Sequence, residues 1–474
     1  MWDLQENIPI TICDFPNEWK QARITPIPKM DSPQDNNDFR PISILPVLSK
    51  IYERLVHNQV VEFLENYHLL EDNISGFRKG HSTASVLLSV RDDILKAMNR
   101  SECTLLVLAD FSKAFDTVKY KAVLEKMNVL GFCKSYLKWT VNYLCGREQF
   151  VQIDDRISKS VSISFGVPQG SIMGPLIFNI YIADLQGKLD CACHQYADDT
   201  TIYQASKPGE LTSCIISVQR NVDKLQCWAN EANLVLNPSK TKYMLLSSTK
   251  LSSYHELNNI DIDLRVGSIS LEHVSSAKLL GTHIDHNLKW EENVKQISAS
   301  CYRTLGILKK LRNFLPFHIR KQLVQALVLS KLYYNCVVYH NLPHYLVKRL
   351  QRIQTASASF VVGKFVESED IIKLSWLPVK EHIEWQLLKL VHKAIYSREW
   401  PGYLRLKQFM HNRTLRSSAA MQLEIPLVSH IYQDQAAKSF NILPGSVRNC
   451  LDFNQFSKMT FKFLMRKVKD NLLA

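Results

Sequence analysis

Two apolar patterns alternate along the chain. In the first, apolar residues recur every three or four positions, which places them on one face of a helix. This pattern predicts helices over 41–68 and 119–130, and further helices are expected at 83–99, 175–185 and 211–230. In the second pattern, apolar residues run without a break over a short stretch. Leu105 to Ala109 is such a run and is typical of a buried strand.

The middle of the chain is predicted to contain a hairpin and short strands, and the chain from Trp290 onward is predicted to be mostly helical. Residues 188–205 are expected to form a hairpin, 250–259 a polar loop and 265–284 several short strands. From Trp290 onward helices dominate, and Pro316 separates two amphipathic ones. We place a candidate domain boundary at 363–368, before a final helical region.

Composition excludes several classes of protein. Of the 474 residues, 46% are hydrophobic and 22% charged, which is ordinary for a globular protein with a core. No apolar stretch is long enough to cross a bilayer, and the first ten residues lack the basic start of a secretory signal. The eleven cysteines are scattered, without zinc-ligand spacing. We therefore expect reduced thiols, no membrane partner and a location in the nucleus or cytoplasm.

The net charge of +13 is concentrated in one segment. Residues 293–366 contain no Asp or Glu and twelve Lys or Arg. Such a one-signed segment is the electrostatic signature of nucleic-acid binding. The candidate contacts are Lys309, Lys310, Arg312, Arg320 and Lys321. A solvated basic face and an acidic protein partner remain as alternatives.

Four pairs of identical adjacent acids occur, and one of these pairs stands out. Asp92-Asp93 falls in an expected helix and is predicted to be solvated, Asp154-Asp155 to form a hairpin turn, and Glu291-Glu292 to open a helix. Asp198-Asp199 lies at the turn of the 188–205 hairpin. Two close carboxylates raise each other's pKa unless a cation offsets them, and Mg²⁺ is the usual cation when phosphates are the substrate.

Asp110 supplies a third carboxylate, because it ends the buried run at 105–109. If that strand neighbours the hairpin in one sheet, Asp110, Asp198 and Asp199 converge and can hold two Mg²⁺ ions, with Mn²⁺ as an alternative. Positioning and charge neutralisation would then catalyse phosphoryl transfer. Asp116 is expected to be structural and to cap the following helix.

Other side chains suit a nucleotide substrate. Phe115, five residues after Asp110, could lie against the sugar and exclude a 2′-hydroxyl, although a core position is the alternative. Arg78 and Lys79, in a glycine-flanked loop, suit a triphosphate. Lys240 could assist the leaving pyrophosphate, although such a lysine is more often a plain surface residue.

A close approach to a base is expected at Gln169 and Gly170, because a glycine lets the backbone come near its ligand.

The ordered motifs resemble those of reverse transcriptases. "LADFSKAFDTV" (108–118), "GVPQGSIMGPLIFNIYIADL" (166–185) and "YADDT" (196–200) resemble motifs A, B and C. "DFRPISILPVLSKIYERL" (38–55), "GFRKGHST" (76–83), "LNPSKTKYMLL" (236–246) and "KLLGTHID" (278–285) resemble fingers, motif D and primer-grip segments. The set is most similar to jockey-like, non-LTR (LINE-type) retrotransposon polymerases. Segments 376–390 and 413–418 resemble the region after the thumb.

The resemblance implies an α+β right-hand polymerase: fingers and an antiparallel palm over 9–285, a basic helical thumb over 286–366 and a helical C-terminal region over 367–474. It implies that Asp110, Asp198 and Asp199 bind Mg²⁺ and that Phe115 selects deoxynucleotides. It also implies that Arg78 contacts the incoming nucleotide and that Gln169 and Gly170 lie along template and nucleotide. An RNA template, a DNA primer and deoxynucleoside triphosphates are the expected partners.

One feature departs from the family. Jockey-like polyproteins carry an endonuclease upstream, and fingers-like residues already begin here near 15–20. The sequence therefore predicts a truncated copy, a fragment or a product that uses an endonuclease in trans. A catalytically silent nucleic-acid-binding remnant and a group II intron-type reverse transcriptase remain alternatives. An RNA-dependent RNA polymerase is disfavoured by Phe115.

Overall fold

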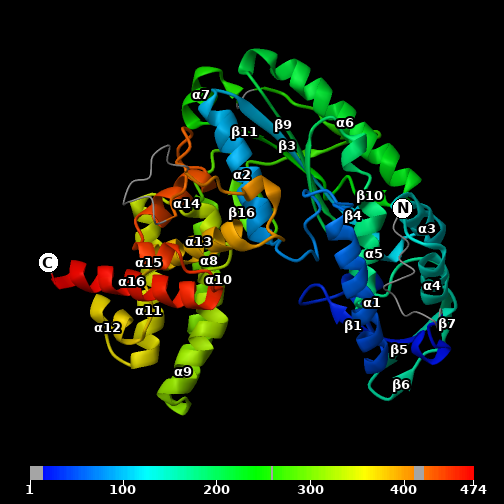
Figure 1. Cartoon of the computed structure of the whole chain (residues 1–474), viewed down its shortest axis with the longest axis horizontal. Helices are drawn as coiled ribbons and strands as arrows, with labels where there is room; N and C mark the ends of the chain where they lie inside the picture. The colour runs from blue at the N-terminus through cyan, green and yellow to red at the C-terminus, as the bar shows by residue number, and fades with distance from the viewer. Residues whose placement is uncertain (1–13, 258–259, 410–420, 474) are drawn as a thin grey trace.

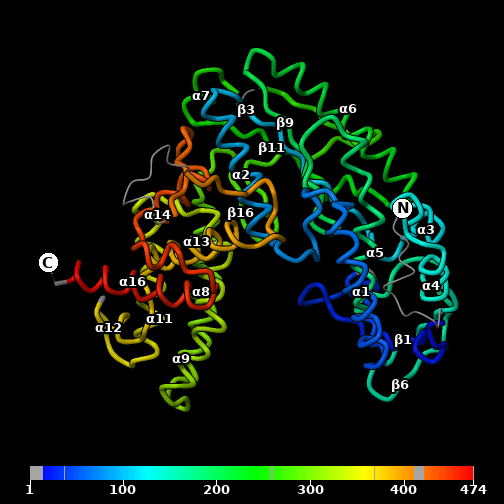
Figure 2. The backbone as a smooth tube through the Cα atoms, in the orientation of Figure 1, coloured from blue at the N-terminus to red at the C-terminus, as the bar shows by residue number. Residues whose placement is uncertain are grey.

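The computed structural model describes residues 14–257, 260–409 and 421–473. Figure 1 shows two lobes in a horseshoe, joined at the top of the view by a central sheet and the long helix α6 (Leu211–Glu231). The first lobe holds the early helices and strands, and the second holds helices from α8 (Glu291–Leu311) to α16 (Phe453–Leu473). The tube in Figure 2 follows the same two halves. The fold mixes helices and strands, as predicted.

The central sheet has five strands and is antiparallel except at one edge. In spatial order they are β14 (Glu272–His273), β11 (Lys242–Leu246), β3 (Cys103–Ala109), β9 (Asp199–Ser206) and β8 (Ala192–Tyr196). Strand β3 pairs with β9 so that Ala109 faces Thr200, and β8 and β9 form the predicted hairpin. The apolar run at 105–109 is therefore a central, buried strand.

A second sheet lies beside the first lobe's helices. It contains β2 (Phe39–Ile44), β1 (Gln21–Pro28), β5 (Arg147–Ile153) and β6 (Arg156–Ile157), with β7 (Val161–Ile163) paired to β5. Strand β2 corrects one prediction, since the helix expected over 41–68 is α1 (Val47–Asn66) and starts later. Pro41 and Pro46 explain the shift, because proline disfavours helical geometry in the residue before it.

Helices α2 (Thr83–Asn99) and α6 pack against the central sheet. The first lobe also holds α3 (Tyr120–Val129), α4 (Lys134–Leu144) and α5 (Met173–Ile182), with α3 packed against the other two. Short elements continue the chain: β4 (Phe111–Ser112), β10 (Val235–Leu236), β12 (Arg265–Val266), β13 (Ile269–Ser270), β15 (Ser276–Leu279) and β16 (Thr282–Asp285). The loop predicted at 250–259 is partly wrong, because α7 (Thr249–Tyr254) is helical, and 258–259 lie outside the described residues. The Ser248 hydroxyl caps α7 through the Leu251 N–H.

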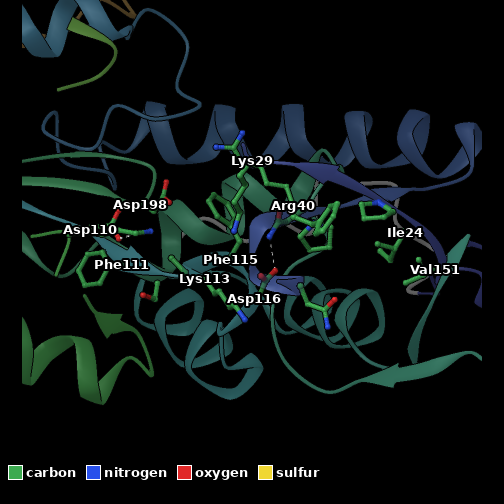
Figure 3. Close-up of a pocket in the computed structure, with 18 of the residues that line it drawn as sticks. Ile24, Lys29, Arg40, Asp110, Phe111, Lys113, Phe115, Asp116, Val151 and Asp198 are labelled. Carbon is green, nitrogen blue, oxygen red and sulfur yellow. Dashed lines mark hydrogen bonds and ion pairs between the residues drawn. The ribbon is translucent and has the colours of Figure 1, made fainter. Parts of the chain in front are cut away.

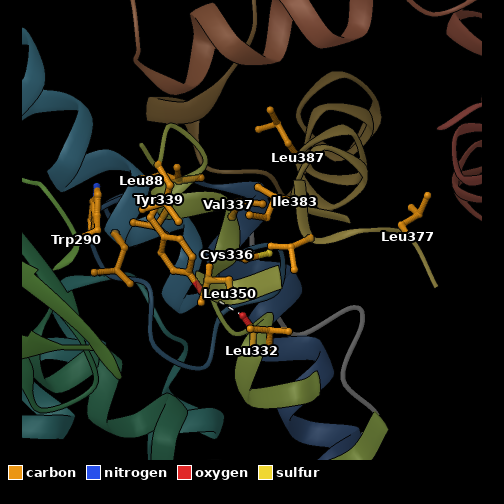
Figure 4. Packing of buried hydrophobic residues seen from close by; sticks show 14 of the residues in the cluster. Leu88, Trp290, Leu332, Cys336, Val337, Tyr339, Leu350, Leu377, Ile383 and Leu387 are labelled. Carbon is orange, nitrogen blue, oxygen red and sulfur yellow. Dashed lines mark hydrogen bonds between the residues drawn. The ribbon is translucent and has the colours of Figure 1, made fainter. Parts of the chain in front are cut away.

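The second lobe is helical, as expected. After α8 come α9 (Phe317–Val324), α10 (Ser330–Leu332), α11 (His344–Val362), α12 (Ser368–Lys373), α13 (Val379–Tyr396), α14 (Tyr432–Asn441), α15 (Gly445–Arg448) and α16. One hydrophobic core runs from Leu88 on α2 through Tyr339 and Leu350 to Leu387 on α13 (Figure 4). The candidate boundary at 363–368 thus separates helices that share a core.

Asp92 contradicts the expectation of a solvated helix face. Its carboxylate is buried beside the Arg91 guanidinium at 2.5 Å and accepts the Tyr432 backbone N–H at 2.7 Å. Arg91 also donates to the Val338 carbonyl. This buried pair ties α2 to the helical lobe, and removing one partner would leave an uncompensated charge. Among the described helices, none is long and apolar enough to cross a membrane.

Candidate active site

A cavity of about 1160 Å³ lies between the two sheets of the first lobe (Figure 3). Asp110 and Asp198 lie at one end and Ile24 and Val151 at the other. The lining brings together predicted site residues from four distant segments: Asp110, Phe115, Gln169, Asp198 and Lys240.

Sheet register brings the carboxylates together. Asp110 follows the last residue of β3, directly beside β9, which begins at Asp199. Ala197, in the two-residue turn of the hairpin, has a φ of 58°, a left-handed conformation that strains a residue with a Cβ. Gly76 packs against this turn so closely that a Cβ there would lie 2.4 Å from the Ala197 nitrogen. Close packing of Gly76 therefore holds the hairpin turn in place.

The three carboxylates interact electrostatically. Desolvation, reinforced by the charges of Asp198 and Asp110, raises the pKa of Asp199 to about 6. Desolvation and then the Asp110 charge raise the pKa of Asp198. Within the described residues, no three His, Cys, Asp or Glu side chains are gathered closely enough to hold a metal ion. Repulsion among three anions favours side-chain rotamers that keep them apart.

Lys240 is held next to Asp110 by its own loop. The Asn237 N–H donates to the Asp110 carbonyl at 2.8 Å, and the Thr241 hydroxyl accepts the Asp110 N–H at 3.3 Å. Lys240 Nζ lies 3.8 Å from Asp110 Oδ2. That oxygen is buried and accepts no hydrogen bond from a described residue. A carboxylate oxygen that accepts no hydrogen bond and lies near other carboxylates is suited to coordinate a cation.

Phe115 is half-buried in the wall of the cavity rather than in the core. Its ring stacks on Phe178 of α5, with centroids 4.4 Å apart and planes at 24°. Phe77 meets it edge-on at 6.3 Å. Since buried Phe178 supports the ring from below, Phe115 presents a rigid apolar wall near Asp110.

Gln169 and Gly170 contact β2 of the second sheet beside the cavity. The Ser43 N–H of β2 donates to the Gln169 carbonyl at 2.7 Å. Gly170 has a φ of 126°, and a Cβ there would lie 2.5 Å from the Ser43 carbonyl oxygen, so only glycine fits. Asp116 accepts a 2.7 Å hydrogen bond from Gln169 Nε2. The prediction that Asp116 caps α3 is wrong, because its side chain points into the cavity, where burial raises its pKa.

Arg78 and Lys79 do not line this cavity, which corrects their predicted contact with the nucleotide. Arg78 is buried and donates twice to Glu65 at 2.9 Å and to two backbone carbonyls. Lys79 pairs with Glu399 at 2.7 Å. The loop turns this way because Ser75 N–H donates to the Gln195 carbonyl, which aligns it with β8.

The cavity contains cations that sequence reasoning missed. Lys29 on the loop after β1, Arg40 on β2 and Lys113 after β4 line its wall. Figure 3 shows Lys29 and Arg40 above Phe115, to the right of Asp110 and Asp198. Arg40 belongs to the fingers-like segment 38–55, but only its place in the second sheet shows that it faces the cavity.

Glu53 is another residue whose role near the site the sequence did not reveal. Its buried carboxylate on α1 accepts the N–H groups of Ile172 (2.7 Å) and Met173 (3.1 Å). A carboxylate at a helix N-terminus satisfies free donors and complements the dipole. Glu53 thus fixes the start of α5, just after Gly170.

The basic segment is only partly available to nucleic acid. Lys309 and Lys310 are exposed at the end of α8. Arg312, however, donates to the Gly363 carbonyl, and Arg320 donates to the Phe360 carbonyl at 3.3 Å. Both cations hold the last turn of α11, and their contact with nucleic acid stays a prediction. Lys321 is half-buried.

Comparison with known proteins identifies the family of this site. The family described as "Reverse transcriptase (RNA-dependent DNA polymerase)" matches residues 27–284. The probable RNA-directed DNA polymerase from transposon BS of Drosophila melanogaster is 29% identical over 334 residues, covering 68% of this chain and 35% of that protein. The RNA-directed DNA polymerase from mobile element jockey of the same species is 28% identical, covering 69% and 36%.

The chain thus spans a little over a third of the length of these relatives. Among solved structures, apo telomerase from Candida tropicalis aligns with a TM-score of 0.43 and 12% identity, over 79% of this chain and 66% of that one.

Proposed function

Because the chain belongs to the reverse transcriptase (RNA-dependent DNA polymerase) family, we propose that it copies RNA into DNA. It would act as the polymerase of a jockey-like, non-LTR retrotransposon, adding deoxynucleotides to a primer 3′-hydroxyl. The observation that carries this proposal is the cavity that joins Asp110 and Asp198 to a phenylalanine wall and several cations. Anionic and cationic groups in one cavity suit a metal-bound triphosphate.

The carboxylates would form a divalent metal site once their side chains turn toward one another. Asp110 Oδ2 accepts no hydrogen bond from the part of the chain that the structure describes. The raised pKa values of Asp198 and Asp199 reflect desolvation and nearby like charge. Asp110, Asp198 and Asp199 would hold two Mg²⁺ ions, with Mn²⁺ as the alternative, after small side-chain rotations. Bound there, the ions would supply activation of the primer hydroxyl and neutralisation of the pyrophosphate.

The chain's own residues position the nucleotide. Phe115 would pack against its sugar and leave no room for a 2′-hydroxyl. Lys29 and Arg40 would contact the triphosphate, in place of Arg78 and Lys79. Lys240 would donate a proton or a hydrogen bond to the leaving pyrophosphate, since it lies beside Asp110.

The helical lobe would hold the template–primer duplex. Residues 9–285 would form fingers and palm, 286–366 the thumb and 367–474 an accessory helical region. Lys309 and Lys310, exposed on α8, are the best placed thumb residues for phosphate contacts. Integration would require an endonuclease activity, supplied in trans or by another part of the protein.

Primer extension tests the proposal directly. With an RNA template, a DNA primer, deoxynucleotides and Mg²⁺, the protein should extend the primer, and Asp198→Ala should abolish extension. Extension that survives this change would contradict the metal assignment. A wild-type protein that binds the template–primer but never extends it would instead be the catalytically silent remnant.

A further inference from the structure

A second cavity, of about 290 Å³, opens beside the first. The two share five lining residues: Ile24, Pro41, Lys113, Asp116 and Gln169. In Figure 3, Ile24 lies at the end of the first cavity away from Asp110, and Asp116 lies between the two ends. The second cavity therefore continues the first in the direction that leads away from the carboxylates.

Two cations face this second cavity, and neither forms an ion pair with a described residue. Arg147 is 1% exposed and Lys20 is 6% exposed. The register of β1 against β5 places Lys20 directly beside Arg147, since Gln21 pairs with Glu148 in parallel. Burial and then the Arg147 charge lower the pKa of Lys20. Two buried like charges on neighbouring strands are costly unless an anion offsets them.

Hydrogen-bond donors without a partner indicate where such an anion would bind. Both terminal nitrogens of Arg147 are buried without a hydrogen-bond partner in the described structure, and only Nε donates, to the Tyr143 carbonyl. The buried Tyr120 hydroxyl, on the same cavity wall, also lacks a partner there. The rings of Phe15 and Tyr143 support the guanidinium by cation–π contacts but fill none of its hydrogen-bond sites.

Two acids also line the cavity, but each has another partner. Glu148 accepts a hydrogen bond from Ser160 at 2.9 Å, and Asp116 accepts one from Gln169. Within the described part of the chain, no carboxylate lies within ion-pair distance of Lys20 or Arg147. The cavity thus offers several free donors and a net positive charge, which suits a phosphate group.

We propose that Lys20, Arg147 and Tyr120 bind a backbone phosphate of the single-stranded template, just ahead of the base that is being copied. This inference rests on the proposed polymerase function. The first cavity has its own cations near the carboxylates for the triphosphate. Phe165, 56% exposed at the wall of the second cavity, offers a ring on which an unpaired template base can stack.

Binding measurements with two template–primers test the site separately from catalysis. One substrate carries a template overhang of a single nucleotide, and the other an overhang of several nucleotides. Lys20→Gln and Arg147→Lys should weaken binding of the long overhang about tenfold, by loss of a charge-assisted hydrogen bond. They should leave binding of the short overhang unchanged. Arg156→Gln, which removes an exposed charge from the same sheet, is the matched control.

Thermal unfolding without nucleic acid guards against a folding defect. Lys20→Gln should keep or raise the melting temperature, because it relieves the repulsion from Arg147, whereas a purely structural Lys20 would lower it. Unchanged binding of both overhangs by folded variants would overturn the proposal. A changed response to inorganic pyrophosphate or deoxynucleotide, independent of overhang length, would overturn the assignment to the template. If wild-type protein binds neither substrate, the proposed function itself fails.

Discussion

Lys240 Nζ lies 3.8 Å from Asp110 Oδ2, the buried carboxylate oxygen that accepts no hydrogen bond from a described residue. Lys240 is two-thirds exposed, so this contact contributes little to stability. The contact matters for the position of Lys240. The loop at 237–241 hydrogen-bonds to both the N–H and the carbonyl of Asp110, which places the Lys240 amine at the carboxylate end of the cavity.

Lys240→Gln should therefore reduce the rate of primer extension about a hundredfold at saturating deoxynucleotide, the usual effect of losing a general acid. The melting temperature should not change. Lys242→Gln is the matched control, because Lys242 is engaged with Glu272 at 2.9 Å and should extend primers normally. Equal rates for both variants would rule out a role for Lys240 in the leaving-group step.

Asp199→Asn should increase the stability of the protein while abolishing its activity. Because the pKa of Asp199 is raised, its ionised form is disfavoured in the folded protein at neutral pH. Removing the charge should raise the melting temperature in chelator at neutral pH, and this gain should vanish as the pH falls below about 4. Extension should be abolished. A melting temperature that falls in the variant would contradict the repulsion argued for this site.

The other aspartate pair provides the control for that experiment. Asp154-Asp155 is also a hairpin turn, between β5 and β6, but it is exposed and remote from Asp110. Asp155→Asn should change neither stability nor extension.

These sites show what a sequence can reveal. Asp110 and Asp198-Asp199 were found because a buried strand and a hairpin have clear local signals, and the sheet register then brings them together. Arg78 was misplaced because the direction of its loop depends on a bridge to β8, more than a hundred residues away. Asp92 looked solvated because its partner, Tyr432, is equally remote in sequence.

The wall formed by Phe115 predicts a change in sugar selection. Phe115→Val should raise the efficiency of ribonucleotides relative to deoxynucleotides on the order of a hundredfold. The ring can be removed without loss of the core, because Phe178 beneath it remains. Phe77→Val, which trims the exposed ring that meets Phe115 edge-on, should leave selectivity nearly unchanged. Unaltered selectivity in Phe115→Val would make Phe115 a packing residue only.

Buried histidines predict sensitivity to acid. Burial lowers the pKa of His194 from 6.5 to about 4. Between about pH 6.5 and pH 4, His194 is protonated in the unfolded chain but neutral in the folded protein. The folded protein therefore loses stability as the pH falls below about 6.5. His194 alone should cost about 2 kcal/mol between neutral pH and about pH 5. Urea unfolding at both pH values should show a smaller loss in His194→Gln. Exposed His318→Gln should behave like wild type, and equal losses in all three proteins would contradict the assignment.

Substitutions of neighbouring cations in the basic segment should have two different effects, one on nucleic-acid binding and one on stability. Neutralising the exposed Lys309 and Lys310 should weaken template–primer binding and reduce its salt slope by about 0.9 for each phosphate that the protein no longer neutralises. Stability should not change. Arg312→Gln should instead lower the melting temperature, because Arg312 holds the Gly363 carbonyl at the end of α11. Binding and unfolding measured on the same variants distinguish the two roles. A salt slope that is unchanged in the double lysine variant would mean that α8 does not contact the duplex, whatever the charge of the segment around it.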